Sequence, residues 1–328
     1  MRRRDFIAGL GGVATWPLAA RAQQPTMPVI GFVQNGSVDA SASFVAGFRK
    51  GLGETGYVEG QNVTVEYHYL EGQLDRLPAL MTDLVRRHVA VIATPGTTGA
   101  SIAAKAATAA IPIVFGVAED PVKLGLVANL ARPGGNATGI NFYTQEVAAK
   151  RLGLLHELVP KAVRVALLIN PANATSAETT LRDVQEAARA LGLQIIHVVN
   201  ASTSGEIDAA FETLAQERPD ALFVAPDAFF NSRRVQLAIL AAHNRIPASY
   251  ATRVYAAAGG LMSYGTDLAD MFRQVGVYTG NILKGAKPAE LPVQQAVKFE
   301  FVINRGTATL LGIEVPPQLI AIADEVIE

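Results

Sequence analysis

Short apolar runs rich in β-branched residues alternate with longer segments of helical periodicity along most of this chain. The alternation is typical of parallel β-sheets covered by helices on both faces. A first series of predicted strands comprises Val29–Val33, Asn62–Tyr69, Val89–Thr94, Ile111–Val117 and Thr138–Phe142. A second series comprises Val163–Asn170, Leu193–Val199, Asp220–Pro226 and Ile246–Tyr250. We therefore predict an α/β protein with two doubly wound parallel-sheet lobes in tandem.

The C-terminal part of the chain complicates a simple tandem arrangement. It adds a predicted strand at Gly259–Gly265, a helix from Asp267 to about Lys284 and a strand at Val297–Asn304. One further strand and helix are then available to each lobe, so the chain is expected to cross between the lobes about three times and to form a hinge. We predict that residues 27–141 with 258–285 form lobe 1, and that residues 142–257 with 286–328 form lobe 2.

The N-terminus, MRRRDFIAGLGGVATWPLAARAQQ, has the organisation of an export signal. A basic start precedes a mild apolar stretch from Phe6 to Ala20, and the small-x-small pattern ends at Ala22. The Arg3-Arg4 pair is similar to a twin-arginine signal. The apolar stretch is shorter than the roughly 20 residues that a membrane-spanning helix needs. We predict that residues 1–22 are an export signal and that the mature protein is soluble in the periplasm.

Composition excludes several kinds of function. The net charge is −1 with scattered Lys and Arg, so nucleic acid is not an expected partner. The chain has no cysteine, which excludes thiol catalysis, Cys-ligated metals, disulfides and a lipid-modified N-terminal cysteine. Its five histidines are widely separated, and no phosphate loop, dinucleotide fingerprint or nucleophile elbow is present. We therefore predict no metal, no cofactor and no lipid anchor.

Polar loops follow the predicted strands, at the strand ends that face the ligand crevice of a parallel sheet. The stretch VIATPGTTGASIAAKAA (Val91–Ala107) is one of them, and it predicts a strand that delivers a helix N-terminus with hydroxyl donors suited to an anion. The predicted ligand-binding residues are Asn35, Ser37, Thr94, Gly96, Thr97, Thr98, Glu119, Asp120, Asn141, Tyr143, Asn170, Asn173, Asp227, Phe229 and Tyr250.

Each of these loops also has a purely structural interpretation. Asp120-Pro121 and Asn170-Pro171 fit an ordinary helix start, with a capping residue followed by proline at the first helical position. Thr97 is a good capping residue with or without a ligand. The aromatic residues near strand ends also suit core or hinge packing. The shared position of the loops after strands is what favours a binding cleft.

Three linked motifs carry a resemblance to a known family. They are G-Y-x-E-G-x-N at residues 56–62, D-P-V-x-x-G-L-V at residues 120–127 and P-G-G-N-x-T-G at residues 133–139. In these stretches the chain resembles the extracytoplasmic substrate-binding proteins of ABC transporters, in the group that includes tryptophan- and tyrosine-binding members. The resemblance extends over essentially the whole mature chain.

The resemblance implies a type I periplasmic-binding-protein fold with three crossovers and a membrane permease as partner. It also implies a ligand carboxylate at Gly96-Thr97-Thr98 and a ligand amine at Asp120 or Asp227. Glu119 beside Asp120 places two acids where other members have one, which leaves room for a more polar or cationic substrate.

We therefore expect a binding protein that captures a small organic solute, an amino acid or another carboxylate-bearing and aromatic molecule, by hinge closure. One alternative is an exported α/β hydrolase or isomerase that uses Glu119, Asp120 and Asp227 as acid and base. Another is a sensor that presents its ligand state to a membrane receptor. The sequence does not separate the sensor from the transport protein.

Overall fold

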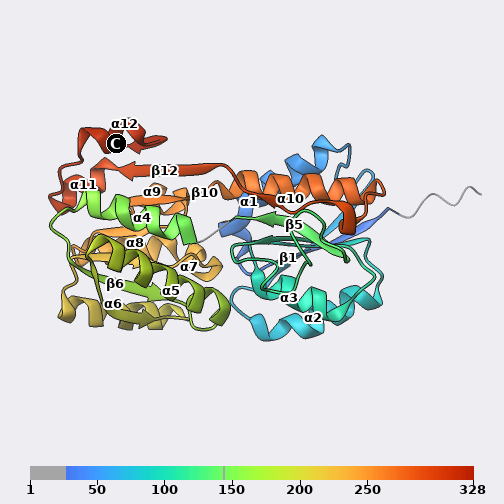
Figure 1. Ribbon diagram of the computed structural model, residues 1–328, viewed down its shortest axis with the longest axis horizontal. Helices are drawn as coiled ribbons and strands as arrows, with labels where there is room; N and C mark the ends of the chain where they lie inside the picture. The colour runs from blue at the N-terminus through green and yellow to red at the C-terminus, as the bar shows by residue number, and fades with distance from the viewer. Residues whose placement is uncertain (1–26, 143–144) are drawn as a thin grey trace, which may run out of the picture.

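The computed structural model describes residues 27–142 and 145–328, which form two α/β lobes side by side (Figure 1). Lobe 1 contains a six-stranded sheet in the order β11-β5-β4-β3-β1-β2, with every strand pair parallel. Its strands are β1 (Val29–Gln34), β2 (Thr64–Tyr69), β3 (Val91–Pro95), β4 (Ile113–Val117), β5 (Ala137–Asn141) and β11 (Gln294–Gln295).

Helices cover both faces of the lobe 1 sheet. They are α1 (Val38–Glu54), α2 (Leu77–Arg86), α3 (Thr98–Ala107) and α10 (Leu268–Leu283), with short 3-10 turns η1 (Leu74–Arg76) and η2 (Pro288–Glu290). Alternate strand residues face opposite sides because side chains of a strand alternate. Phe32 packs with α1 and α10, whereas the next residue, Val33, packs with α2 and α3. The near-continuous apolar runs of the sequence follow from this double coverage.

Lobe 2 contains a seven-stranded sheet in the order β13-β12-β10-β9-β8-β6-β7, in which the β10–β12 pair alone is antiparallel. Its strands are β6 (Arg164–Ile169), β7 (Gln194–Asn200), β8 (Ala221–Val224), β9 (Ala248–Tyr250), β10 (Met262–Thr266), β12 (Phe299–Asn304) and β13 (Glu325–Ile327). Its helices are α4 (Gln145–Leu158), α5 (Ala174–Leu191), α6 (Ser204–Glu217), α7 (Ala228–Ser232), α8 (Arg234–His243), α9 (Arg253–Ala257), α11 (Arg305–Leu311) and α12 (Pro317–Ile322).

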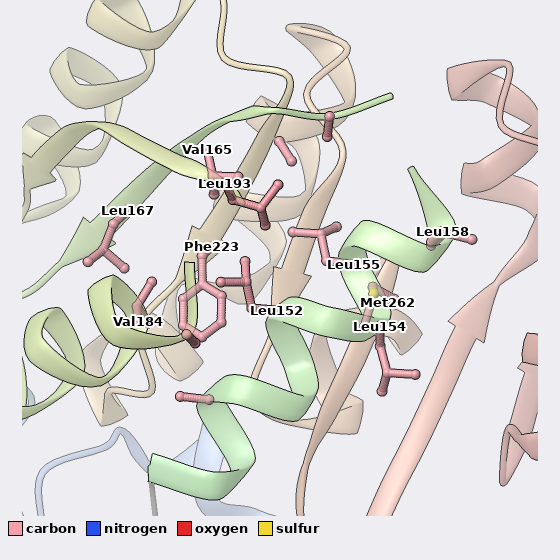
Figure 2. Packing of buried hydrophobic residues seen from close by; sticks show 14 of the residues in the cluster. Leu152, Leu154, Leu155, Leu158, Val165, Leu167, Val184, Leu193, Phe223 and Met262 are labelled. Carbon is pink, nitrogen blue, oxygen red and sulfur yellow. The ribbon is translucent and has the colours of Figure 1, made fainter. Parts of the chain in front are cut away.

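The core of lobe 2 lies between its sheet and helices α4 and α5. Leu152 of α4 and Val184 of α5 point toward Phe223 of β8 (Figure 2). The opposite face packs against α6 and α8. The first five strands of each lobe share one order, since β2-β1-β3-β4-β5 corresponds to β7-β6-β8-β9-β10. The prediction of two doubly wound parallel-sheet lobes in tandem is confirmed.

One strand lies in the other lobe from the one predicted. The strand expected in lobe 1 at residues 259–265 is β10, which pairs with β9 and β12 in lobe 2. It is the fifth strand of the lobe 2 module and follows directly from α9, so it joins that sheet before the chain leaves the lobe. The helix predicted after it, α10, does pack on lobe 1, and the two-residue strand β11, which falls in the segment predicted for lobe 2, pairs with β5 of lobe 1. The predicted division at residues 258, 285 and 286 is wrong to that extent.

The chain passes between the lobes after β5, between β10 and α10, and between β11 and β12 (Figure 1). These connections are hydrogen-bonded to one another. Thr266 Oγ1 donates to the Phe142 carbonyl (3.0 Å), and the Asp267 amide donates to the Lys298 carbonyl (3.0 Å). The Ala296 amide likewise donates to the Asn141 carbonyl (2.9 Å). The expected hinge of about three crossings is therefore present.

The N-terminal segment predicted as an export signal, residues 1–22, lies outside the described residues. Within residues 27–142 and 145–328, no helix combines the length and the apolar character needed to cross a bilayer.

Candidate functional site

A cavity of ≈ 110 Å³ lies between the two lobes, at the carboxyl ends of strands from both sheets. This is the place where parallel α/β sheets usually bind ligands. Lobe 1 contributes the loops after β1, β3 and β4, and lobe 2 contributes α4, the start of α5 and the loops after β8 and β9. The polar lining residues are Gln34, Asn35, Thr97, Thr98, Glu119, Arg151, Asn173, Ser176, Thr180, Asp227, Asn231, Thr252 and Thr266.

The loop between β3 and α3 forms one wall of the cavity. Gly96 has a φ of +73°, a left-handed conformation that favours glycine, and it turns the chain from β3 into the helix. Thr97 is the N-cap residue of α3, but its hydroxyl accepts the Asn35 amide (3.0 Å) instead of capping the helix. The first helical bond runs from the Ser101 amide to the Thr97 carbonyl (3.1 Å), so the preceding amides of the first turn have no helical acceptor.

Glu119 brings a negative group against that first turn. Its side chain is 6% exposed, and its Oε2 accepts a 2.6 Å hydrogen bond from Thr98 Oγ1. The positive end of a helix dipole stabilises a nearby carboxylate. The α3 N-terminus therefore already has an acidic partner within the protein.

Asp227 forms the acidic part of the lobe 2 wall. It is the N-cap residue of α7, and its Oδ1 accepts the Phe229 amide (2.9 Å) and the Asn170 side-chain amide (3.0 Å). Its Oδ2 accepts from Asn173 Nδ2 (3.1 Å). Burial raises the pKa of the Asp227 carboxyl, and the hydrogen bonds from Asn170, Asn173 and the α7 amides partly oppose that rise.

The cavity brings together seven of the predicted residues, namely Asn35, Gly96, Thr97, Thr98, Glu119, Asn173 and Asp227. Two other predicted residues support this group without lining the cavity. Asn141 donates from Nδ2 to the carbonyls of Val117 (3.0 Å) and Glu119 (2.8 Å), which fixes the loop after β4. Asn170 orients Asp227 and accepts from Ser202 Oγ (2.8 Å). Both are positioning residues because their amides are used within the protein.

Three predicted residues have local structural roles and lie away from the cavity lining. Ser37 is the N-cap of α1, where its hydroxyl accepts the Ala40 amide (3.4 Å). Thr94 Oγ1 shares a hydrogen bond with Ser101 Oγ (2.8 Å) under α3. Asp120 is exposed and accepts the Val122 amide (2.9 Å) at the turn it begins. The residues after Asp120-Pro121 form a turn rather than the helix start that the capping interpretation predicted.

The predicted aromatic residues also lie outside the cavity lining. Tyr250 is fully buried and stacks on Tyr255 with ring centroids 4.5 Å apart. Phe229 packs against Phe230 in the core of lobe 2, with centroids 5.8 Å apart. Tyr143 lies outside the described residues.

The sequence reasoning missed Arg151 and Thr180, which line the cavity from α4 and α5. A charged residue in a helix ordinarily indicates a solvated face. Arg151, however, continues the inward stripe of Ala148, Leu152 and Leu155, at helical spacings of three and four. This helical spacing is the feature of the sequence that could have identified Arg151 as an inward-facing residue.

Some buried polar atoms without hydrogen-bond partners belong to residues that line this cavity. In the described part of the chain, Gln34 Oε1, Arg151 Nε and Thr180 Oγ1 are buried and unpartnered, and all three residues line it. Such atoms are rare in native proteins and call for a partner. They come from both lobes, which suits a polar solute held between them. No group of His, Cys, Asp and Glu side chains within the described ranges is arranged to hold a metal ion.

Two α/β lobes with a polar cavity between their facing strand ends form the type I periplasmic-binding-protein fold, as the resemblance implied. Comparison with known proteins gives the family. The sequence profile described as ABC transporter substrate binding protein matches residues 27–327. The chain belongs to that family, and its class is therefore a binding protein. The alternative of an enzyme using Glu119, Asp120 and Asp227 is wrong, and the exposed position of Asp120 agrees with that outcome.

Individual proteins are similar to this chain over most of their length. A tyrosine-binding protein from Clostridioides difficile is 26% identical over 292 residues, covering 89% of this chain and 82% of that protein. A Vibrio cholerae conserved domain protein has a TM-score of 0.83 at 26% identity, over 92% of this chain and 99% of the other. A Streptococcus pneumoniae ABC domain in complex with L-Trp has a TM-score of 0.82 at 25% identity, with the same coverage.

Proposed function

We propose that this protein is the extracytoplasmic solute-binding component of an ABC importer. It captures a small carboxylate-bearing organic solute, such as an amino acid or an aromatic acid, and presents it to the membrane permease. The observation that carries the proposal is the cavity lined from both lobes, where unpartnered buried atoms of Gln34, Arg151 and Thr180 converge. Each such atom is costly unless a partner binds it.

Two observations support the solute class. The relatives named above include a tyrosine-binding protein and a structure with bound L-Trp. The ≈ 110 Å³ cavity is similar in size to an engineered cavity of about 150 Å³ that admits benzene in another protein. A solute with one ring or a short aliphatic chain suits that space.

Hinge closure is the proposed mechanism, since contacts from both lobes exist together only when the cleft is shut. The lobes are close here, because a Cβ at Gly72 of lobe 1 would lie 4.0 Å from Cδ2 of Phe229 in lobe 2. A ligand-free, open substrate binding protein from Clostridium difficile gives a TM-score of only 0.65, against 0.82 for the L-Trp complex. This difference supports a closed arrangement of the present lobes.

Export to the periplasm remains part of the proposal and rests on the sequence of residues 1–22. A cleaved signal would leave a soluble carrier that can meet a permease at the outer face of the cytoplasmic membrane. N-terminal sequencing of protein recovered from the periplasm would test it, and a start near Gln23 is expected.

The binding function is tested by thermal-shift screening with the L-amino acids and a set of aromatic and aliphatic carboxylates, followed by calorimetry. A solute that binds only the folded state stabilises it by about 2.7 kcal/mol at 100 times its dissociation constant. Small-angle scattering with the same solute should then give a smaller radius of gyration. A complete absence of stabilising solutes would reject the solute class, and an unchanged radius with a bound solute would reject closure.

A further inference from the structure

Arg151 is a buried cation on the lobe 2 wall of the cavity. It lies in α4, its exposed fraction is 2%, and it is among the largest fully buried side chains of the described chain. Arginine is almost never fully buried unless it is paired. Its position therefore needs a specific reason.

Among the described residues, Arg151 makes one hydrogen bond and one ring contact. Nη2 donates to the Val224 carbonyl (3.0 Å), and the guanidinium carbon lies 3.8 Å from the centroid of the Phe223 ring. Nε has no partner. No acidic side chain among the described ones pairs with Arg151 in a salt bridge. A guanidinium has five donors in a planar fork that matches a carboxylate.

The charge of Arg151 persists despite burial. Burial lowers the pKa of Arg151 to about 9, which still leaves the side chain cationic at neutral pH. An uncompensated buried charge costs several kcal/mol. A cation kept under these conditions is suited to receive an anion, and the cavity is where an anion can reach it.

The opposite wall is less suited to an anion than the sequence indicates. Thr98 already donates its hydroxyl hydrogen to Glu119 at the start of α3, and Glu119 places a buried negative charge there. Asp227 adds a second acid on the lobe 2 side. A solute carboxylate at Gly96-Thr97-Thr98 would meet the Glu119 charge at close range, and like charges at close range repel.

Resting on the proposed function, we propose that Arg151 is the anion-recognising residue of the cleft. Its guanidinium binds the solute carboxylate from the lobe 2 side, and the unpartnered hydroxyl of Thr180 on the neighbouring helix α5 is a second donor. Glu119 and Asp227 then face the amine or other hydrogen-bond donors of the solute. This orientation reverses the assignment of the carboxylate to the α3 N-terminus. It also makes the carboxylate, rather than the amine, the group that the protein requires.

Matched solutes that differ by one charged group test this orientation. The probes are L-tyrosine, tyramine and 3-(4-hydroxyphenyl)propionate, with the corresponding L-tryptophan and L-leucine sets, measured by calorimetry. Wild type is compared with Arg151→Gln, Arg151→Lys, Thr97→Val and the control Lys150→Gln. Lys150 is the exposed neighbour of Arg151 on α4, so its substitution removes the same charge away from the cavity. Circular dichroism and thermal unfolding verify that each variant is folded.

We expect the wild type to bind the acids and the amino acids of at least one set and to bind the amine-only member weakly. Arg151→Gln should lower affinity for the carboxylate-bearing members by roughly 10- to 150-fold and leave the weak amine binding unchanged. Arg151→Lys should retain part of the affinity, and Lys150→Gln all of it.

The contrary outcomes are distinct. Carboxylate affinity that survives in Arg151→Gln but falls in Thr97→Val would place the anion at α3 and overturn the inference alone. Equal wild-type affinity for the amine and the acid would also overturn it. If the wild type binds no member of any set, the proposed aromatic or amino acid solute fails, and the inference fails with it.

Discussion

Thr98 donates a hydrogen bond of 2.6 Å to the buried carboxylate of Glu119, so lobe 1 presents a negative group at the start of α3. If Glu119 faces the amine of the solute, Glu119→Gln should weaken L-tyrosine binding by about 1.5–3 kcal/mol, the value of a hydrogen bond to a charged group. Binding of 3-(4-hydroxyphenyl)propionate, which lacks the amine, should be unchanged or tighter. Calorimetry with both solutes measures the difference.

Asp120→Asn is the matched control for Glu119→Gln. Asp120 is the adjacent acid, it is exposed, and asparagine can still accept the Val122 amide. It should leave the affinity for both solutes unchanged. Equal losses for L-tyrosine and the deaminated acid in Glu119→Gln would show that Glu119 acts on the shape of the loop rather than on the amine.

Asp227 gives the protein a pH-dependent contribution to stability. Its pKa in the folded protein is raised above the ordinary 3.8, chiefly by burial, so the folded state holds this proton more tightly than the unfolded chain. The contribution is therefore complete below about pH 3.8 and is lost as the pH rises through the raised pKa. The difference in free energy of unfolding between wild type and Asp227→Asn should shift in favour of wild type as the pH falls.

Urea unfolding of wild type and Asp227→Asn between about pH 3.5 and 7 measures this difference. The contributions of the other acids are the same in both proteins and cancel. The control is the loss of an acid that lies outside the cavity lining. The exposed Asp120→Asn is suitable. A difference between wild type and Asp227→Asn that stays constant over the range would contradict the raised pKa.

Arg151 provides a test that separates ligand recognition from a structural role. Arg151→Met removes the charged hydrogen bond to the Val224 carbonyl, worth about 1.5–3 kcal/mol, and the contact with the Phe223 ring. It also removes a buried unpaired charge whose desolvation costs several kcal/mol. We expect the free energy of unfolding of the ligand-free protein to be unchanged or higher, while stabilisation by a carboxylate solute is lost. A clear loss of ligand-free stability would indicate a structural role.

Much of the fold was predictable because its signal is local. All eleven strands predicted from apolar runs are present, with each end within three residues of its predicted position. The two strands that were missed, β11 and β13, have two and three residues and half-buried or exposed side chains, so they carry no apolar run. β10 pairs with β9, the strand before it along the chain, and with β12, so it continues the lobe 2 module in sequence order. The residue pattern identifies the strand but does not state the sheet to which it is added.

The location of the cavity was predictable from the sequence, but the identity of the residues that line it was less so. Loops at the carboxyl ends of the strands do line the cavity, as the topology requires. Within each loop, however, the same residue types serve as caps and as ligands, and the side chains of Asp120 and Thr94 form hydrogen bonds within lobe 1 away from the cavity lining. Arg151 lies in a helix rather than a loop, and whether a helical charge faces a cavity depends on tertiary packing. Asp227 serves both as the cap of α7 and as part of the cavity wall.

The placement of α10 on lobe 1 depends on glycine contacts that can be tested directly. A Cβ on Gly51 of α1 would overlap the carbonyl oxygen of Arg273 in α10, and one on Gly276 of α10 would overlap the Phe48 carbonyl of α1. Gly51→Ala should therefore lower the free energy of unfolding by about 1–3 kcal/mol, the usual cost of overpacking. Gly53→Ala, two residues away with no atom within 4 Å of the added Cβ, should raise it by up to about 1 kcal/mol. Urea unfolding of the two variants compares them, and equal effects would show that α10 does not pack closely on α1.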